Sequence, residues 1–272
     1  MKHYPKFLFP VFLWFILLHS LQAVAQPETL QYFSITYVKI KAAAKANDYI
    51  KLITDYGNPL THYRSGHSNV KGWNVYQIIM PAGQNNEYDF AIETFANDVQ
   101  VLLDDTTNMG EVFKKIFPEK NDAEMKAVFN KYVTLRTVIK VEVFQALSLT
   151  RNSKNPPLYA KVNFMKVLPG MDSAFVSLEN KEWMKLHRVG MRLGIMADWE
   201  LDKKLLPANR NADFDYLSVD FYNTINAMFD VRYNNAVKTL WPGGEAAKVF
   251  KETEASRIFV RSEIWKLVNY AR

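Results

Sequence analysis

Apolar and polar positions along the chain follow two periods, one typical of strands and one of helices. Residues 32–41 read Tyr-Phe-Ser-Ile-Thr-Tyr-Val-Lys-Ile-Lys, a β-branched and aromatic run with rough alternation that predicts a strand. From residue 47 the period lengthens, because Tyr49, Ile50 and Ile53 fall on one helical face. Gly57-Asn58-Pro59 is expected to interrupt or end that helix.

The same patterns continue through the chain and predict two similar halves. The first half has further strands over 72–80, 88–95 and 135–147, with helices over 97–103 and onward to about 131. Its order is β-α-β-β-α-β, the split βαβ unit of ferredoxin-like folds. The second half repeats this order, with strands over 160–167, 195–206, 213–222 and 257–270, a helix over 173–191 and helical segments after 223.

An internal repeat supports this division. Residues 73–104 and 199–230 align without a gap at an offset of 126 and share eight identities in 32 positions, among them Trp73 with Trp199 and Asp89 with Asp215. The last strands align at an offset of 121, with Arg136 matching Arg257 and Phe144 matching Trp265. The repeat therefore predicts units at 26–150 and 158–272, joined by a polar, proline-ended linker over 151–157.

The N-terminus has the pattern of a secretory signal peptide. A short basic start precedes an apolar run over residues 7–21, and Ala23-Val24-Ala25 offers a cleavage site before Gln26. A membrane anchor is disfavoured, because the run is shorter than the roughly 20 residues of a spanning helix. We expect a periplasmic or secreted protein, cleaved near Ala25–Gln26, with no span after cleavage.

Charge and cysteine content exclude several classes. The net charge of +6 falls to +4 once Lys2 and Lys6 are removed, and the remaining charges are interspersed, so a nucleic-acid partner is not expected. The sequence has no cysteine, which excludes disulfides, thiolate metal sites and a cysteine nucleophile. Histidine spacing shows no zinc motif, and no metal site is predicted.

The plan of two fused units resembles the dimeric alpha–beta barrel superfamily. The Gly72-Trp73-Asn74-Val75-Tyr76 strand, and the tyrosine-bearing third strand after a Pro-Ala loop, are similar to NIPSNAP-like and antibiotic-biosynthesis-monooxygenase-like members. The resemblance implies an α+β fold in which tandem ferredoxin-like units form an intrachain barrel. Related families include cofactor-free monooxygenases, isomerases and haem enzymes such as chlorite dismutases. No family catalytic motif is present, so no residue role is carried across, and the cofactor is left unassigned.

Two histidines are candidate site residues. His62 and His187 lie near the ends of the two first helices, within one residue of the repeat offset. Each is suited to be a general base, a haem ligand or half of a pseudo-symmetric site. The competing interpretation is a partly exposed histidine at a helix C-terminus, where the helix dipole favours a cation.

Charged residues on the last strands are the other candidates. Alternation predicts that they share one face with Phe144 and Trp265, while Ile139, Val141 and Val143 pack on helices. If the mixed faces line the barrel interior, these charges either pair with one another or hold an acidic ligand; on a solvated face they form cross-strand ion pairs. The candidates are Arg136, Lys140, Glu142, Arg257, Arg261 and Glu263.

The repeated Asp89 and Asp215 are interpreted as turn-capping residues rather than an acid–base pair, and Trp73 and Trp199 as core residues.

The predicted function is that of an exported protein that binds a small, partly aromatic or acidic molecule. One alternative is an enzyme of the monooxygenase, isomerase or haem type that uses His62 or His187. Another is a protein-interaction module without a pocket. The sequence does not indicate the oligomeric state.

Overall fold

The computed structural model describes residues 31–41, 45–68, 70–81, 86–103, 108–150, 153, 155–208 and 212–272. The predicted signal peptide and part of the predicted linker lie outside the described residues. No helix of the described residues is long and apolar enough to cross a membrane.

Both halves of the chain follow the predicted order of elements. The first unit contains β1 (Gln31–Ile40), α2 (Ala46–Leu52), η1 (Ile53–Gly57), α3 (Asn58–His67), β2 (Val70–Met80), β3 (Phe90–Ala96), α4 (Val99–Leu103), α5 (Met109–Ile116), α6 (Asp122–Leu135) and β4 (Arg136–Leu149). The second contains β5 (Tyr159–Val167), α7 (Asp172–Leu178), η2 (Glu179–Trp183), α8 (Met184–Arg192), β6 (Asp198–Leu206), β7 (Tyr216–Tyr222), η3 (Ile225–Phe229), α9 (Arg232–Leu240), η4 (Pro242–Gly244), α10 (Glu245–Ser256) and β8 (Arg257–Ala271).

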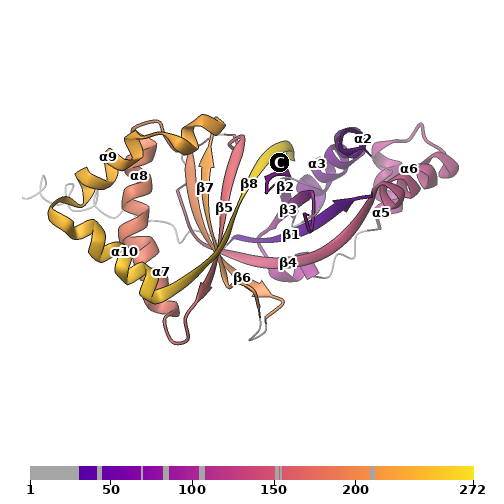
Figure 1. Cartoon of the computed structure of the whole chain (residues 1–272). Coiled ribbons are helices and arrows are strands. Elements are labelled where there is room, and N and C mark those ends of the chain that lie inside the picture. Colours follow the sequence, from indigo (N-terminus) through magenta and orange to yellow (C-terminus); the bar gives the residue numbers. More distant parts are fainter. Residues whose placement is uncertain are drawn as a thin grey trace, which may run out of the picture.

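The strands close into one antiparallel barrel in the order β1-β3-β2-β8-β5-β7-β6-β4. Each unit contributes a ferredoxin-like sheet, and pairing of β2 with β8 and of β4 with β6 joins the two sheets. Helices of the first unit cover one side of the barrel and α7 to α10 cover the other (Figure 1). The predicted α+β fold of two fused ferredoxin-like units in a barrel is confirmed.

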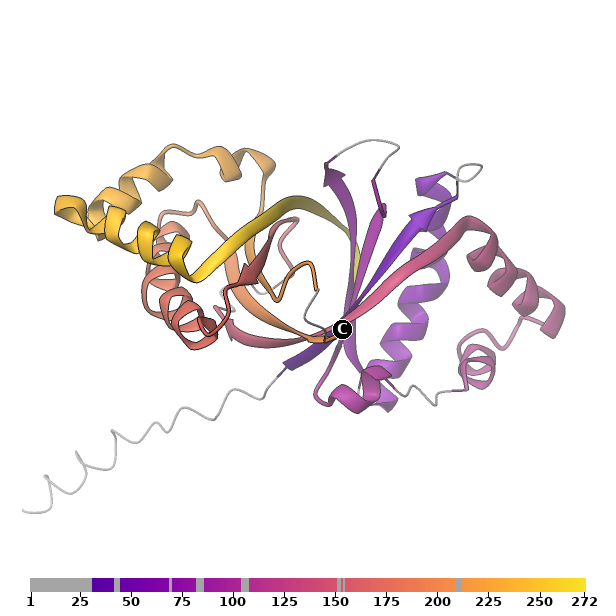
Figure 2. The same ribbon diagram turned by 60° about the horizontal axis from the view of Figure 1, so that its bottom comes forward.

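The barrel interior is filled by side chains. Phe33, Ile35, Phe144, Phe164 and Trp265 are all buried there in one cluster. Smaller apolar clusters lie outside the barrel, between each sheet and its helices. The view in Figure 2 separates these two helical layers from the strands between them. Each unit has a cavity of about 420 Å³ between its sheet and its helices.

The strand register confirms the repeat. Trp73 on β2 pairs with Thr94 on β3, and Trp199 on β6 pairs with Asp220 on β7, each at the offset of 126. Both units also have a π-helical segment at matching positions, η1 and η2. The two tryptophans thus occupy equivalent strands.

The first helix decides between two predicted alternatives. Gly57-Asn58-Pro59 interrupts the helix and does not end it, because the π-helical η1 ends at Gly57 and continues directly into α3. Pro59 stands in the first turn of α3, where its missing N–H is tolerated. Gly57 is required for another reason: a Cβ there would lie 2.3 Å from Cη2 of Trp73.

Two β-bulges correct the predicted strand faces. The register between β1 and β4 shifts so that Ile139 is unmatched between Val138 and Lys140, and Val260 is unmatched on β8 in the same way. A bulge reverses the alternation of the residues beyond it. Arg136 and Arg257 consequently lie on the helix side, not on the inner face with Lys140 and Arg261. Ile139 and Val141 are 39% and 50% exposed, contrary to the expected packing on helices.

Candidate functional site

The second unit holds a cavity of about 420 Å³ between its sheet and its helices. The floor is the outer face of β5, β7 and β8, and α8 with the segment from η3 into α9 forms the opposite wall. A volume in this range suits a small organic ligand. Its lining residues include Lys161, Asn163, Glu179, His187, Asp220 and Arg257.

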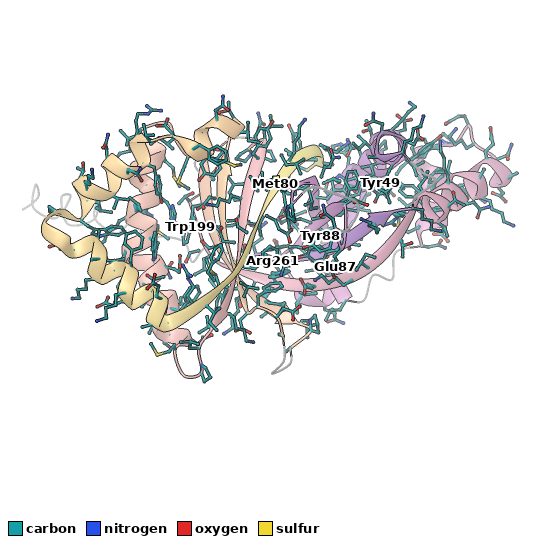
Figure 3. The ribbon with its side chains drawn as sticks, viewed as in Figure 1. Tyr49, Met80, Glu87, Tyr88, Trp199 and Arg261 are labelled. Carbon is teal, nitrogen blue, oxygen red and sulfur yellow. The ribbon has the colours of Figure 1, made fainter. Side chains whose placement is uncertain are left out.

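His187 is buried against this cavity. It lies on α8 and is 5% exposed. Its ring stacks on Trp199 at a centroid distance of 5.2 Å and lies 6.3 Å from the ring of Trp183. Figure 3 places Trp199 between the barrel and the helices of the second unit. Burial lowers the pKa of His187, although the nearby Asp220 carboxylate acts in the opposite direction. The imidazole is therefore neutral near pH 7.

Asp220 lies beside the histidine, on strand β7 of the sheet. Its Oδ1 atom lies 3.7 Å from Nδ1 of His187, and its Oδ2 accepts a hydrogen bond of 3.2 Å from Nδ2 of Asn163. The hydroxyl of Tyr233 lies 3.5 Å from the same Nδ1. Within the described residues Oδ1 of Asp220 is buried without a hydrogen-bond partner. An unsatisfied buried acceptor costs free energy, so this atom is suited to receive a ligand's hydrogen-bond donor.

Glu179 and Arg257 also belong to the polar lining. Glu179 lies in η2 and is 3% exposed, and burial raises its pKa to about 8 although Arg257 acts against this shift. The carboxyl group is thus largely protonated at pH 7. Burial also lowers the pKa of Arg257, whose Nε has no hydrogen-bond partner in the described part of the chain. A π-helical turn is frequently found at functional sites.

The two units differ in their ionisable groups. At the repeat offset, Ile53, Thr61 and Thr94 occupy the positions of Glu179, His187 and Asp220. Sequence reasoning selected His187 and Arg257 but missed Glu179 and Asp220. A signal was present, because each is an acid aligned with an apolar or hydroxyl residue of the other copy. The ionisable cluster is therefore specific to the second unit.

Four of the predicted charged residues lie inside the barrel. Glu263 accepts hydrogen bonds from Tyr88, Trp265 and Arg261 at 2.8 to 2.9 Å. Glu142 lies 3.5 Å from Nζ of Lys204 and 4.0 Å from Nζ of Lys140. Figure 3 shows Tyr88 and Arg261 together at the barrel. These contacts connect both units across the barrel, and the ligand-binding role of Lys140, Glu142, Arg261 and Glu263 stays a prediction.

The other candidates have local roles. His62 is exposed, and its Nδ1 lies 3.1 Å from the carbonyl oxygen of Arg272, so the structure does not bring it together with His187. Asp89 accepts a hydrogen bond from the backbone of Ile40, and Asp215 accepts one from Val167. Each aspartate also pairs with a lysine, Lys39 or Lys166, so both tie their strand to the end of another strand and do not cap a local turn as expected. No cluster of three or more potential metal-ligating side chains occurs in the described ranges.

The fold places this chain among barrels built from two ferredoxin-like units. No protein-family model matches the sequence, and no curated protein matches it. A provisionally assigned monooxygenase from Fusobacterium nucleatum has a TM-score of 0.53 at 11% identity, over 89% of this chain and 94% of that one. Another from Lactobacillus acidophilus gives 0.53 at 12%, over 89% and 96%. The likeness establishes the fold alone, a barrel of two ferredoxin-like units in one chain.

Proposed function

We propose that this chain binds a small, partly aromatic molecule in the second-unit cavity and moves a proton on it through His187. The observation that carries the proposal is the buried cluster of Glu179, His187 and Asp220 around that cavity. Perturbed ionisable groups in a concave site are typical of active sites. Their replacement by Ile53, Thr61 and Thr94 in the first unit argues against a purely structural need for them.

The lining defines the ligand's chemistry. Trp183, Met228 and Phe259 supply an apolar surface that suits a ring. Oδ1 of Asp220 and Nε of Arg257 have no hydrogen-bond partner among the residues that the structure describes, so the first can accept from a ligand's donor and the second can donate to a ligand's acceptor. A hydroxylated aromatic acid meets all three requirements, because its hydroxyl group donates and its carboxylate accepts.

The proposed chemistry is general acid–base catalysis. Neutral His187 accepts the ligand's proton, and the Asp220 carboxylate beside Nδ1 stabilises the imidazolium that forms. Protonated Glu179 donates a hydrogen bond to the developing anion, assisted by the positive charge of Arg257. Proton removal of this kind is a step shared by isomerases and cofactor-free oxygenases.

The described geometry does not fit a haem group. Trp199 stacks directly on His187, and Asp220 approaches Nδ1, so the space between the imidazole and the sheet is filled. The cavity walls also carry Lys161, Asn163 and Asp220 where a porphyrin face requires apolar contacts. We therefore assign no step to haem.

Replacing Asp220 tests the site. With 2-hydroxybenzoate as the probe in calorimetric titration, Asp220→Asn and His187→Gln are each expected to weaken binding by about tenfold or more, the effect of losing a charge-assisted hydrogen bond. His62→Gln is the matched control and should leave affinity unchanged. His62 is exposed, lies beside the carbonyl oxygen of Arg272 and does not line the second-unit cavity. Equal affinity in the wild type and all three variants would contradict the proposal. A Soret band in the purified protein would contradict the assignment of chemistry without haem.

We also propose that the chain is exported and has no nucleic-acid partner. The basic start, the apolar run over residues 7–21 and Ala23-Val24-Ala25 support export. N-terminal sequencing of the exported protein is expected to begin near Gln26, and an intact Met1 in that fraction would refute export. Replacing Ala25 by Asp should block cleavage, because signal cleavage requires small residues at that position.

A further inference from the structure

The first unit holds a cavity of its own between sheet and helices. It lies on the outer face of β1, β2 and β3 under α3 and α6, and its volume is about 420 Å³. The space is open to solvent on one side, and its volume lies in the range of sites for small organic ligands. It occurs in the half without the ionisable cluster, so its lining has to be considered separately.

The lining of this cavity is aromatic and cationic. Trp73, Phe129 and Tyr132 form apolar walls, and Thr36 and Thr94 add hydroxyl groups. The charged residues in the lining, Arg64 and Arg136, are both cations. Such a surface complements a flat molecule that carries negative charge.

Arg136 is positioned to bind the anionic group. Its guanidinium lies 5.9 Å from the ring centroid of Tyr49 and 5.7 Å from that of Tyr132, contacts that hold the side chain beside the cavity. In the described part of the chain no salt bridge joins Arg136 to a carboxylate. A planar guanidinium binds carboxylate and sulfonate groups with paired hydrogen bonds, so an anionic ligand would supply the counterion.

Comparison of the two units shows which lining residues they share and which they do not. Arg136 and Arg257 match at the offset of the last strands, and both line cavities of the same size. The first unit has Ile53, Thr61 and Thr94 in place of the acid–base residues. We infer that the first-unit cavity is a second binding site, which takes an aromatic anion on Arg136 without acting on it. This inference rests on the walls of this cavity and not on the chemistry proposed for the other.

The test counts bound probe on the folded, full-length chain. With 8-anilinonaphthalene-1-sulfonate in equilibrium dialysis, we expect two molecules per chain. Arg136→Gln should weaken one site by about tenfold or more, and Arg257→Gln the other. Arg136→Lys keeps the charge and should restore part of the affinity, and unchanged thermal unfolding of each variant excludes loss of fold.

A charge control and a reporter complete the test. Naphthalene, which carries no charge, should bind the wild type and Arg136→Gln with equal affinity. The anionic probe bound in the first unit should quench the fluorescence of Trp73, which lines that cavity. Wild-type stoichiometry and affinity in Arg136→Gln would overturn the second site. An unchanged result for Arg257→Gln alone would instead contradict the ligand site proposed in the second unit, so the two failures are distinguishable.

Discussion

The free energy of unfolding should fall as pH rises from about 5 to 9, and Glu179→Gln should make that fall smaller. The pKa of Glu179 is raised from 4.5 to about 8 by burial, so the folded state holds a proton that the unfolded state releases. The stabilisation is complete below pH 4.5 and is lost as pH rises through about 8. At about 1.4 kcal/mol per pKa unit, this loss is roughly 3 to 5 kcal/mol.

Chemical denaturation at several pH values measures this effect. Glu179→Gln should match the wild type near pH 5 and exceed its stability at pH 9, while Glu119→Gln on the exposed surface should follow the wild type throughout. Burial also raises the pKa of Glu93, to about 7, and that of Asp202, so the variant keeps a pH dependence of the same sign. His187 changes the stability in the opposite direction below pH 6.5, the ordinary pKa of histidine. Its burial in the folded protein disfavours the protonated imidazole. If the unfolding free energy of Glu179→Gln depended on pH as that of the wild type does, Glu179 would be ionised in the folded protein.

Glu263→Gln should destabilise the barrel by about 2 to 3 kcal/mol. Three donors, from Tyr88, Arg261 and Trp265, point at this buried carboxylate, and a glutamine amide would place its own donor against one of them. For a chain of this size the melting temperature should fall by roughly 5 to 10 °C.

Glu87→Gln is the matched control for the barrel network. Glu87 also faces a lysine, at 3.6 Å from Lys140, but is 57% exposed, and exposed ion pairs contribute little. Its melting temperature should therefore stay near that of the wild type. If Glu263→Gln kept the melting temperature and weakened ligand binding, the ligand-binding role predicted for these charges would hold and the structural explanation would fail.

Much of the fold followed from periodicity, because strands that pack on a core must alternate and helices must repeat near every fourth residue. Local irregularities did not follow. The placement of Arg136 and Arg257 was wrong because one extra residue, Ile139 or Val260, reverses the faces beyond it. Nothing in a run of β-branched residues indicates where such a bulge falls.

The site was predicted only in part. The repeat made His187 and His62 candidates together, with a shared pseudo-symmetric site as one alternative, but His62 lies one residue from the matching position and is exposed. Glu179 was missed because a glutamate in a helix is ordinarily a surface residue, and only the packing of Arg257 and Asp220 around it shows that it is buried. Sequence spacing alone does not reveal which polar residue a helix turns inward.

Closure of the barrel across the repeat has a consequence for how the chain is made. The last strand, β8, pairs with β2 from the first unit and β5 from the second. Until residues 257–271 leave the ribosome, both of those strands present an unpaired edge, which is a template for aggregation. Pairings so distant in sequence also form slowly. Neither half can cover its own strand edges, so a nascent chain can close its barrel only once residues 257–271 are available to pair.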